Sequence, residues 1–414
     1  MQRSLVTPYI RTSGAALQHA VTPTTWREAL RVDFSRAGVA APLRVGVAVG
    51  VVLVVGALLG QRDLAGLAAL GALVSAFCRP DPYPVRAPRL VALAVGITAA
   101  IALGSTMGVY ANSIVVEIIV TALLAGIACY FVSALRIVGP GAVIFVFAAT
   151  GAAGFAHSPA DIGRAVLASV IGAVIGIVIA LAPWLANTAM ALLRGTRTGS
   201  SSTSVTARRE SLWVSLAGGH SPANRRHLAL TAFRIAVAAT IAAVIAVAVH
   251  LDHPMWAAMG AVAAMQGVEY HLTVRRGVQR LLGNLGGALI AGLLLSIPLG
   301  YWGAVAGIII FQVLAEILST VNYALCSLAV TPMALLLTGL SAGLSPEAAV
   351  DRVLDTAIGI VVGIVVAALT IRGHEMATLH SAPERVATVP VSAESTAHDD
   401  AAPESSTAGY RSRS

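Results

Sequence analysis

Three arginines at the polar end of an apolar stretch are the residues best suited to bind an anion. Arg275, Arg276 and Arg280 follow a polar turn, and Gly283 and Gly287 come about one and two helical turns after Arg280. Arginines beside a helix start, with glycines in its first turns, place positive charge and backbone N–H groups where a carboxylate could bind. The alternative is that the arginines anchor a membrane helix at its cytoplasmic end, while the glycines allow close helix packing.

Two acidic residues lie inside apolar segments, where an ionised side chain costs several kcal/mol. Glu117 lies about a turn and a half into one segment, and Glu316 lies near the inner end of another. Either residue is a candidate for carrying a coupling proton. The alternative is that both lie near the membrane interface, where they reach water or pair with a cation.

A dense group of charges, Asp351, Arg352 and Asp355, begins the last apolar segment. A helix would place the two aspartates on one face, because they are four residues apart, and both could then share Arg352. One interpretation is a gate at the outer end of this helix. A solvated helix start explains the same residues about as well.

The composition indicates that these residues work within a membrane. Of the 414 residues, 57% are hydrophobic and only 11% are charged, and the mean hydropathy is +0.83. We therefore expect an all-α, polytopic membrane protein. The net charge of +8 comes from arginine alone, and the positive-inside rule explains it without a nucleic-acid partner.

Motifs for catalysis and metal binding are missing from the sequence. The three cysteines lie within or at the edge of apolar segments and form no Cys-x-x-Cys pair. A Walker-type phosphate loop needs a lysine, and the chain has none. We expect no enzyme activity, no metal and no cofactor.

Twelve apolar segments follow one another, and we expect each to be a membrane helix. They cover residues 42–60, 64–78, 89–109, 112–131, 136–154, 160–186, 228–249, 255–268, 278–297, 301–319, 321–341 and 346–371. A span needs about 20 residues, so the segments 64–78 and 255–268 are short and could be tilted, broken or half inserted. Ten spans with two re-entrant segments is the alternative.

Polar sequence divides the chain into regions. Residues 42–186 and 228–372 are the membrane regions, and residues 187–227 between them are expected to be a flexible cytoplasmic linker. Residues 373–414, rich in Ala, Ser, Pro and Glu, are expected to be a disordered cytoplasmic tail.

The N-terminal region, residues 1–41, contains one amphipathic pattern. Thr25 and Glu28 have the spacing of a capping box, and Trp26, Leu30 and Phe34 recur every four residues. The pattern predicts an interfacial helix on the cytoplasmic membrane surface.

Short motifs recur in the same order in the two membrane regions. Arg89 with Gly96 matches Arg280 with Gly287, and a Ser-Pro pair followed by Gly-x-x-x-Gly occurs near the end of each region. The sequence therefore predicts two parallel six-helix repeats, related by an axis near the membrane normal. Arg89 becomes a further candidate for substrate binding through its match to Arg280.

The arginine distribution predicts the orientation of the chain. With the N-terminus inside, every arginine except Arg62, Arg164 and Arg352 falls in a region assigned to the cytoplasm. The positive-inside rule then places both termini in the cytoplasm.

The second membrane region resembles the fusaric acid resistance (FUSC) family of integral membrane transporters. This family is related to aromatic acid exporters and, more distantly, to plant aluminium-activated malate channels. The matching residues are Trp256, Arg280 to Gly283, Gly286, Gly287, Tyr323, Ala324, Thr331, Pro332, Asp351, Arg352, Asp355, Thr356 and Gly359. Met255, Gly267 and Asn284 depart from the usual pattern of Tyr, Pro and Thr.

The resemblance implies export of small organic anions, aromatic carboxylic acids above all, across the plasma membrane. Proton coupling would require a titrating carboxylate within the membrane, whereas a passive organic-anion channel would need none. A non-transporting membrane scaffold, with the linker and tail recruiting partners, is a third reading. The sequence leaves open the substrate, the coupling ion and whether the protein forms a homo-oligomer.

Overall fold

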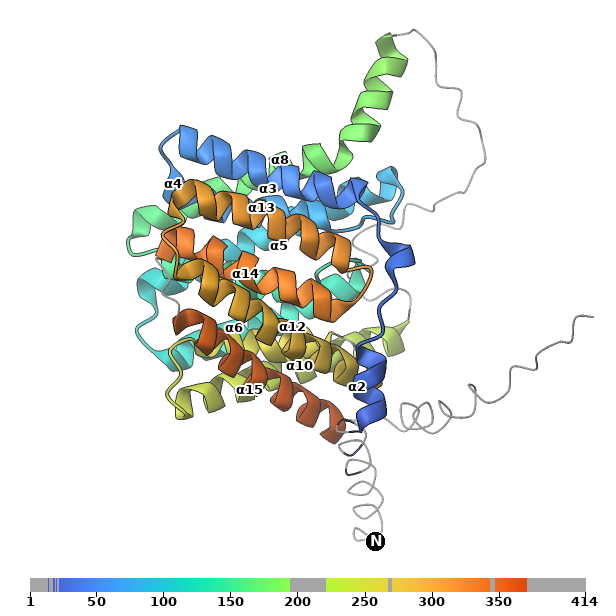
Figure 1. Ribbon diagram of the computed structural model, residues 1–414, viewed down its shortest axis with the longest axis vertical. Coiled ribbons are helices and arrows are strands. Elements are labelled where there is room, and N and C mark those ends of the chain that lie inside the picture. The colour runs from blue at the N-terminus through green and yellow to red at the C-terminus, as the bar shows by residue number, and fades with distance from the viewer. Residues whose placement is uncertain are drawn as a thin grey trace, which may run out of the picture. The chain divides into compact units, whose positions relative to one another are not determined.

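The computed structural model describes residues 22–193, 221–266, 270–342 and 347–370, together with Gly14, Gln18 and Ala20. All regular structure within these residues is helical, which confirms the predicted all-α class (Figure 1). The first part contains α2 (Pro23–Ala29), η1 (Phe34–Arg36), α3 (Ala40–Leu58), α4 (Arg62–Ala72), η2 (Leu73–Ala76), α5 (Tyr83–Tyr110), α6 (Ile114–Ala134), α7 (Val143–Phe155) and α8 (Pro159–Leu193). The second contains α10 (Pro222–Ala248), α11 (Pro254–Met265), α12 (Tyr270–Leu295), α13 (Gly300–Leu318), α14 (Tyr323–Ala342) and α15 (Glu347–Leu369). The linker residues 194–220 and the tail lie outside the described residues.

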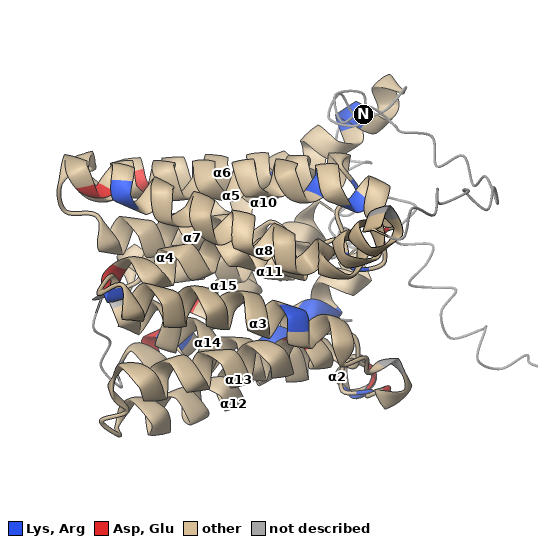
Figure 2. Ribbon diagram, turned by 90° about the horizontal axis from the view of Figure 1, so that it is seen from above, with Lys and Arg blue, Asp and Glu red and all other residues tan. Residues whose placement is uncertain are grey.

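Nine of the described helices are long and apolar enough to cross a membrane. They are α3, α5, α6, α8, α10, α12, α13, α14 and α15. Charged residues lie mainly near the ends of the helices, and the lengths between them are largely uncharged (Figure 2). The chain is therefore a multi-pass membrane protein, as its composition predicts.

Three further helices occupy apolar segments but are short. α4 has 11 residues, α7 has 13 and α11 has 12. At a rise of about 1.5 Å per residue, none of them covers a hydrocarbon core about 30 Å thick. Every residue of α11 from Trp256 to Met265 is buried, as is every residue of α4 from Ala65 to Ala72. Protein, rather than lipid, therefore surrounds these two helices.

Glycines bring the backbones of the long helices against the short ones. A Cβ atom added to Gly359 of α15 would lie 2.1 Å from the Ala257 carbonyl oxygen of α11. A Cβ atom added to Gly172 of α8 would lie 1.8 Å from the Ala68 carbonyl oxygen of α4. Only glycine fits at either position, because the two backbones are in contact there.

The same set of neighbours occurs twice among the described helices. α4 packs against α3 and α8, and α11 packs against α10 and α15. α5 packs against α7 and α8, and α12 packs against α14 and α15. Between the halves, α6 packs against α10, and α13 packs against α3.

The N-terminal helix is shorter than the sequence predicts. α2 begins after Thr22, with Pro23 in its first turn, and ends at Ala29, so Thr25 is not its cap and no single helix reaches Phe34. The Ala29 carbonyl oxygen accepts hydrogen bonds from the side-chain amides of Gln279 (2.7 Å) and Asn322 (3.0 Å). These amides satisfy the carbonyl group that another helical turn would have used.

The start of α7 also differs from prediction, by seven residues. The segment expected to begin at 136 is non-helical up to Val143, because Gly139, Pro140 and Gly141 interrupt it. Gly141 has a φ of 84°, in the left-handed region that favours glycine.

Candidate functional site

A cavity of about 350 Å³ lies where α4 with η2 ends and α7 begins, facing helices of the second half. The charged residues in its lining are Arg79, Arg276, Arg280, Glu316 and Arg352. Most of the remaining lining is apolar and includes Leu73, Val143, Ile144, Phe147, Met259, Val330 and Met333. Four of these five, Arg276, Arg280, Glu316 and Arg352, are site candidates from the sequence, and the structure brings those four together.

The helix carrying two of these arginines begins earlier than expected. α12 starts at Tyr270, so Arg280 lies in its third turn, and the predicted helix start beside Arg280 is wrong. A Cβ atom on Gly283 would lie 2.2 Å from the Ala324 carbonyl oxygen, and one on Gly287 would lie 2.6 Å from that of Leu328. Both glycines therefore serve the packing of α12 against α14, and their N–H groups lie inside the helix.

The arginines of α12 point in different directions. Arg275 is exposed and does not line the cavity. The Arg276 guanidinium lies over the Tyr323 ring, 4.5 Å from its centroid, and Arg280 Nη1 donates to the Tyr323 hydroxyl at 3.4 Å. Tyr323, at the start of α14, thus contacts both arginines that α12 contributes to the cavity, a role that was not predicted from the sequence.

Arg352 enters the cavity from α15. It is buried, and its guanidinium lies 4.9 Å from the centroid of the Trp256 ring. Its backbone carbonyl accepts from Asn284 Nδ2 at 3.0 Å, and Asn284 Oδ1 accepts from the Thr331 hydroxyl at 2.9 Å. Asn284, one of the departures from the family pattern, therefore joins α12 to both α14 and α15.

The other two residues of the predicted gate form no ion pair with Arg352. Asp351 Oδ2 is 3.4 Å from His253 Nδ1, and the His253 ring stacks on Trp256 with centroids 4.1 Å apart. Asp355 is fully buried, and neither of its carboxylate oxygens has a hydrogen-bond partner. Neither aspartate forms an ion pair with Arg352 in the described structure, so the sharing considered for these three residues is not observed.

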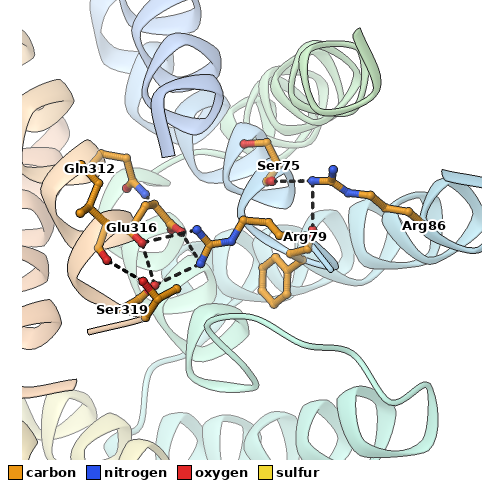
Figure 3. Close-up of polar contacts among 9 residues, drawn as sticks. Ser75, Arg79, Arg86, Gln312, Glu316 and Ser319 are labelled. Atoms are coloured by element: carbon orange, nitrogen blue, oxygen red, sulfur yellow. Dashed lines mark hydrogen bonds and ion pairs between the residues drawn. The ribbon is translucent and has the colours of Figure 1, made fainter. Parts of the chain in front are cut away.

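Glu316 is paired with an arginine of the first half. Arg79 Nη2 lies 3.1 Å from Glu316 Oε2 and donates to Ser319 Oγ at 3.1 Å (Figure 3). Gln312 Nε2 donates to the other Glu316 oxygen at 3.2 Å. From the sequence, Arg79 is expected only to be one of the cytoplasmic arginines. The available signal was its position directly after a short apolar segment and just before a proline-rich turn.

Glu117 and Arg89 lie outside the cavity. Glu117 is in the first turn of α6, which Ser113 caps. Arg89 Nη1 pairs with Asp81 Oδ2 at 2.7 Å. Its neighbour Arg86 is the buried one, and it donates to the carbonyl of Ser75 at 3.3 Å (Figure 3). The structure therefore does not bring Arg89 or Glu117 together with Arg280.

Metal ligation finds no support in the described residues. They contain no group of three or more His, Cys, Asp or Glu side chains that could hold a metal ion. The three cysteines are free and buried.

The second half of the chain, which supplies most of the cavity, can be compared with known proteins. Residues 241–366 match the family model described as fusaric acid resistance protein-like. The resemblance read from the sequence is confirmed over this region. The matched region contains four of the charged cavity residues, Arg276, Arg280, Glu316 and Arg352.

A curated relative is the uncharacterized membrane protein YvaC of Bacillus subtilis (strain 168). It is 30% identical over 145 residues, which are 34% of this chain and 22% of the relative. The match thus covers about a fifth of the relative's length. No solved structure matches this chain.

Proposed function

We propose that the protein exports small organic anions, aromatic carboxylates among them, from the cytoplasm across the plasma membrane. The observation that carries this proposal is the convergence of Arg276, Arg280 and Arg352 on one largely apolar cavity. A guanidinium group binds a carboxylate through two parallel hydrogen bonds, and apolar lining suits an aromatic body. Residues such as Phe147 and Met259 provide that lining.

The charge balance of the cavity favours an anion. Glu316 neutralises Arg79, whereas no ion pair joins Arg276, Arg280 or Arg352 to a carboxylate in the described structure. A buried guanidinium without a counter-ion is costly. An anion entering the cavity would supply the missing negative charge.

The exposure of the lining supports an export direction. Ser319 and Thr320 are exposed at one end of the cavity, whereas Arg352 and Met259 are only 4% and 1% exposed. The exposed end belongs to the side that the arginine distribution assigns to the cytoplasm. An anion would therefore enter from the cytoplasm. Because the end of the cavity at Arg352 and Met259 is closed, a carrier is favoured over a continuously open pore. A passive anion channel is the second candidate function.

The same proposal includes the arrangement of the whole membrane unit. The recurrence of neighbouring helices supports two parallel six-helix repeats, with twelve helices and both termini in the cytoplasm. The cavity would then lie between the repeats, where alternating access is commonly built. Substrates would be exposed to either side by movement of one repeat against the other.

The test is efflux of benzoate from cells that produce Arg276→Gln, Arg280→Gln or Arg275→Gln variants at matched levels. We expect the two cavity variants to lose most benzoate efflux, because each removes a guanidinium that faces the cavity. Arg275→Gln is the matched control, since it removes the same charge from an exposed position of the same helix. Equal efflux by all three variants would contradict the proposed site. Absence of efflux from wild-type cells across a panel of aromatic and dicarboxylic acids would contradict the function.

A further inference from the structure

Asp355 carries a buried carboxyl group that does not line the cavity. Its residue is 0% exposed, and neither Oδ1 nor Oδ2 has a hydrogen-bond partner. It lies one helical turn after Arg352 on α15 and does not line the cavity. Arg352 Nε is also buried without an acceptor. Two groups that could pair with each other are therefore both left unpaired.

A carboxyl group in such surroundings has two stable arrangements. An isolated ionised carboxylate away from water is costly, so the group is either protonated or paired with a cation. Arg352 is the cation within reach, because residues three apart on a helix lie on the same face. In the observed arrangement the Arg352 guanidinium lies over Trp256 and lines the cavity instead.

Among the described residues, the other charged groups around Asp355 provide no alternative cation. Asp351 on α15 and Asp252, just before α11, are the other charged side chains that act on it, and both are acidic. Arg280 on α12 acts on Arg352, and both arginines line the cavity. Arg352 is therefore the group through which a change of charge at Asp355 reaches the substrate.

We propose that Asp355 is a proton-binding site, and that it and the substrate carboxylate compete for Arg352. When Asp355 takes a proton from water, Arg352 keeps an unbalanced charge and can bind the substrate anion. When Asp355 is ionised, it neutralises Arg352 and weakens the binding of the anion. This inference rests on the proposed function and assigns the coupling proton to a different residue from Glu316 or Glu117.

The proposal fixes the stoichiometry and the sign of coupling. One proton on Asp355 accompanies one monovalent anion on Arg352, so the two together bring no net charge into the site. Proton and anion therefore strengthen each other's binding, by the same factor in both directions. The step is a cotransport of both species, and the gradient of the acid itself would drive its export.

The experiment measures benzoate binding to purified protein over a pH series from about 5 to 9, and proton uptake in weakly buffered solution. We expect wild-type affinity to fall by up to about tenfold per pH unit on the alkaline side, because one proton is bound with each anion. Asp355→Asn should bind benzoate with no such slope and no proton uptake. Glu117→Gln, which alters a carboxyl group outside the cavity that does not act on Asp355, should keep the wild-type slope.

The outcomes separate this inference from the proposed function. Wild-type protein that binds benzoate without proton uptake would overturn the proton site alone, even if Asp355→Asn does not fold. A wild-type slope in Asp355→Asn, or a slope lost in Glu316→Gln but kept in Asp355→Asn, would also overturn it. Failure of the wild-type protein to bind any carboxylate of the panel would overturn both proposals.

Discussion

Tyr323 determines how two of the cavity arginines present their charge. Its ring supports the Arg276 guanidinium, and its hydroxyl accepts from Arg280. A cation over an aromatic face is stabilised by about 0.5–2 kcal/mol, depending on how far it is desolvated. The same contact limits the rotamers of a long side chain, so less entropy is lost when an anion binds. Arginine suits this arrangement better than lysine, because its guanidinium is planar.

Replacing Arg280 by lysine tests this geometry while keeping the charge. We expect the half-saturating benzoate concentration for efflux to rise, by the equivalent of about 1–3 kcal/mol, because lysine lacks the two-donor fork. Arg89→Lys is the matched control, since Arg89 pairs with Asp81 outside the cavity. If the half-saturating benzoate concentration is unchanged in both variants at normal protein levels, Arg280 does not bind the substrate and only anchors its helix.

Part of the site could be predicted from single residues. Arg280, Glu316 and Arg352 stand out because a charged side chain inside apolar sequence needs a polar cavity or a partner. Arg79 could not be identified in this way, because it resembles any arginine that ends a membrane segment. Its bond to the Glu316 backbone joins residues 237 positions apart, and no local pattern encodes that distance.

At the scale of the helices, hydropathy locates the elements but not their ends. A helix covers each of the twelve apolar segments. The ends depend on groups elsewhere in the chain, such as the amides of Gln279 and Asn322 that stop α2. α12 extends ten residues before Arg280 because its first turns are amphipathic and buried on one face, which an apolar average does not detect.

The packing of the short helix α11 against α15 gives a stability prediction. Gly359→Ala should destabilise the protein by about 1–3 kcal/mol or more, because the added Cβ atom would overlap the Ala257 carbonyl. Gly163→Ala on α8 is the control, since a Cβ atom there meets nothing within 4 Å. The measurement is the thermal unfolding midpoint of both variants in detergent. Equal midpoints would show that α11 and α15 can move apart without cost.

At the scale of the whole molecule, the sidedness of the chain follows from its arginines. The linker before the second membrane region is rich in arginine, and both polar regions that flank this membrane region are expected on the cytoplasmic side. The export direction depends on this orientation, because the exposed end of the cavity lies on the same side. Hydropathy locates the apolar segments. The number of helices that cross the membrane depends on the three short helices, whose positions are determined by tertiary packing.

Labelling of single cysteines introduced into residues 199–204 tests the orientation. A membrane-impermeant maleimide should label them only after the cells are permeabilised, since the linker is expected in the cytoplasm. The three native cysteines are buried and should contribute little background. Labelling in intact cells would show that the linker lies outside the cell, and it would contradict both the predicted orientation and the proposed direction of export.

The hydrogen bonds at the end of α2 join Ala29 to α12 and to the start of α14. The hydrogen-bond partners of the Ala29 carbonyl are synthesised much later: Gln279 follows 250 residues after Ala29, and Asn322 follows 293 residues after it. At a synthesis rate of about 5–20 residues per second, Asn322 leaves the ribosome roughly 15 to 60 s after Ala29. During that time α2 has no partner in α12 or α14, so its docking must follow insertion of the second half. α2, although it is made before the nine long membrane helices, is thus among the last elements to reach its place during biogenesis.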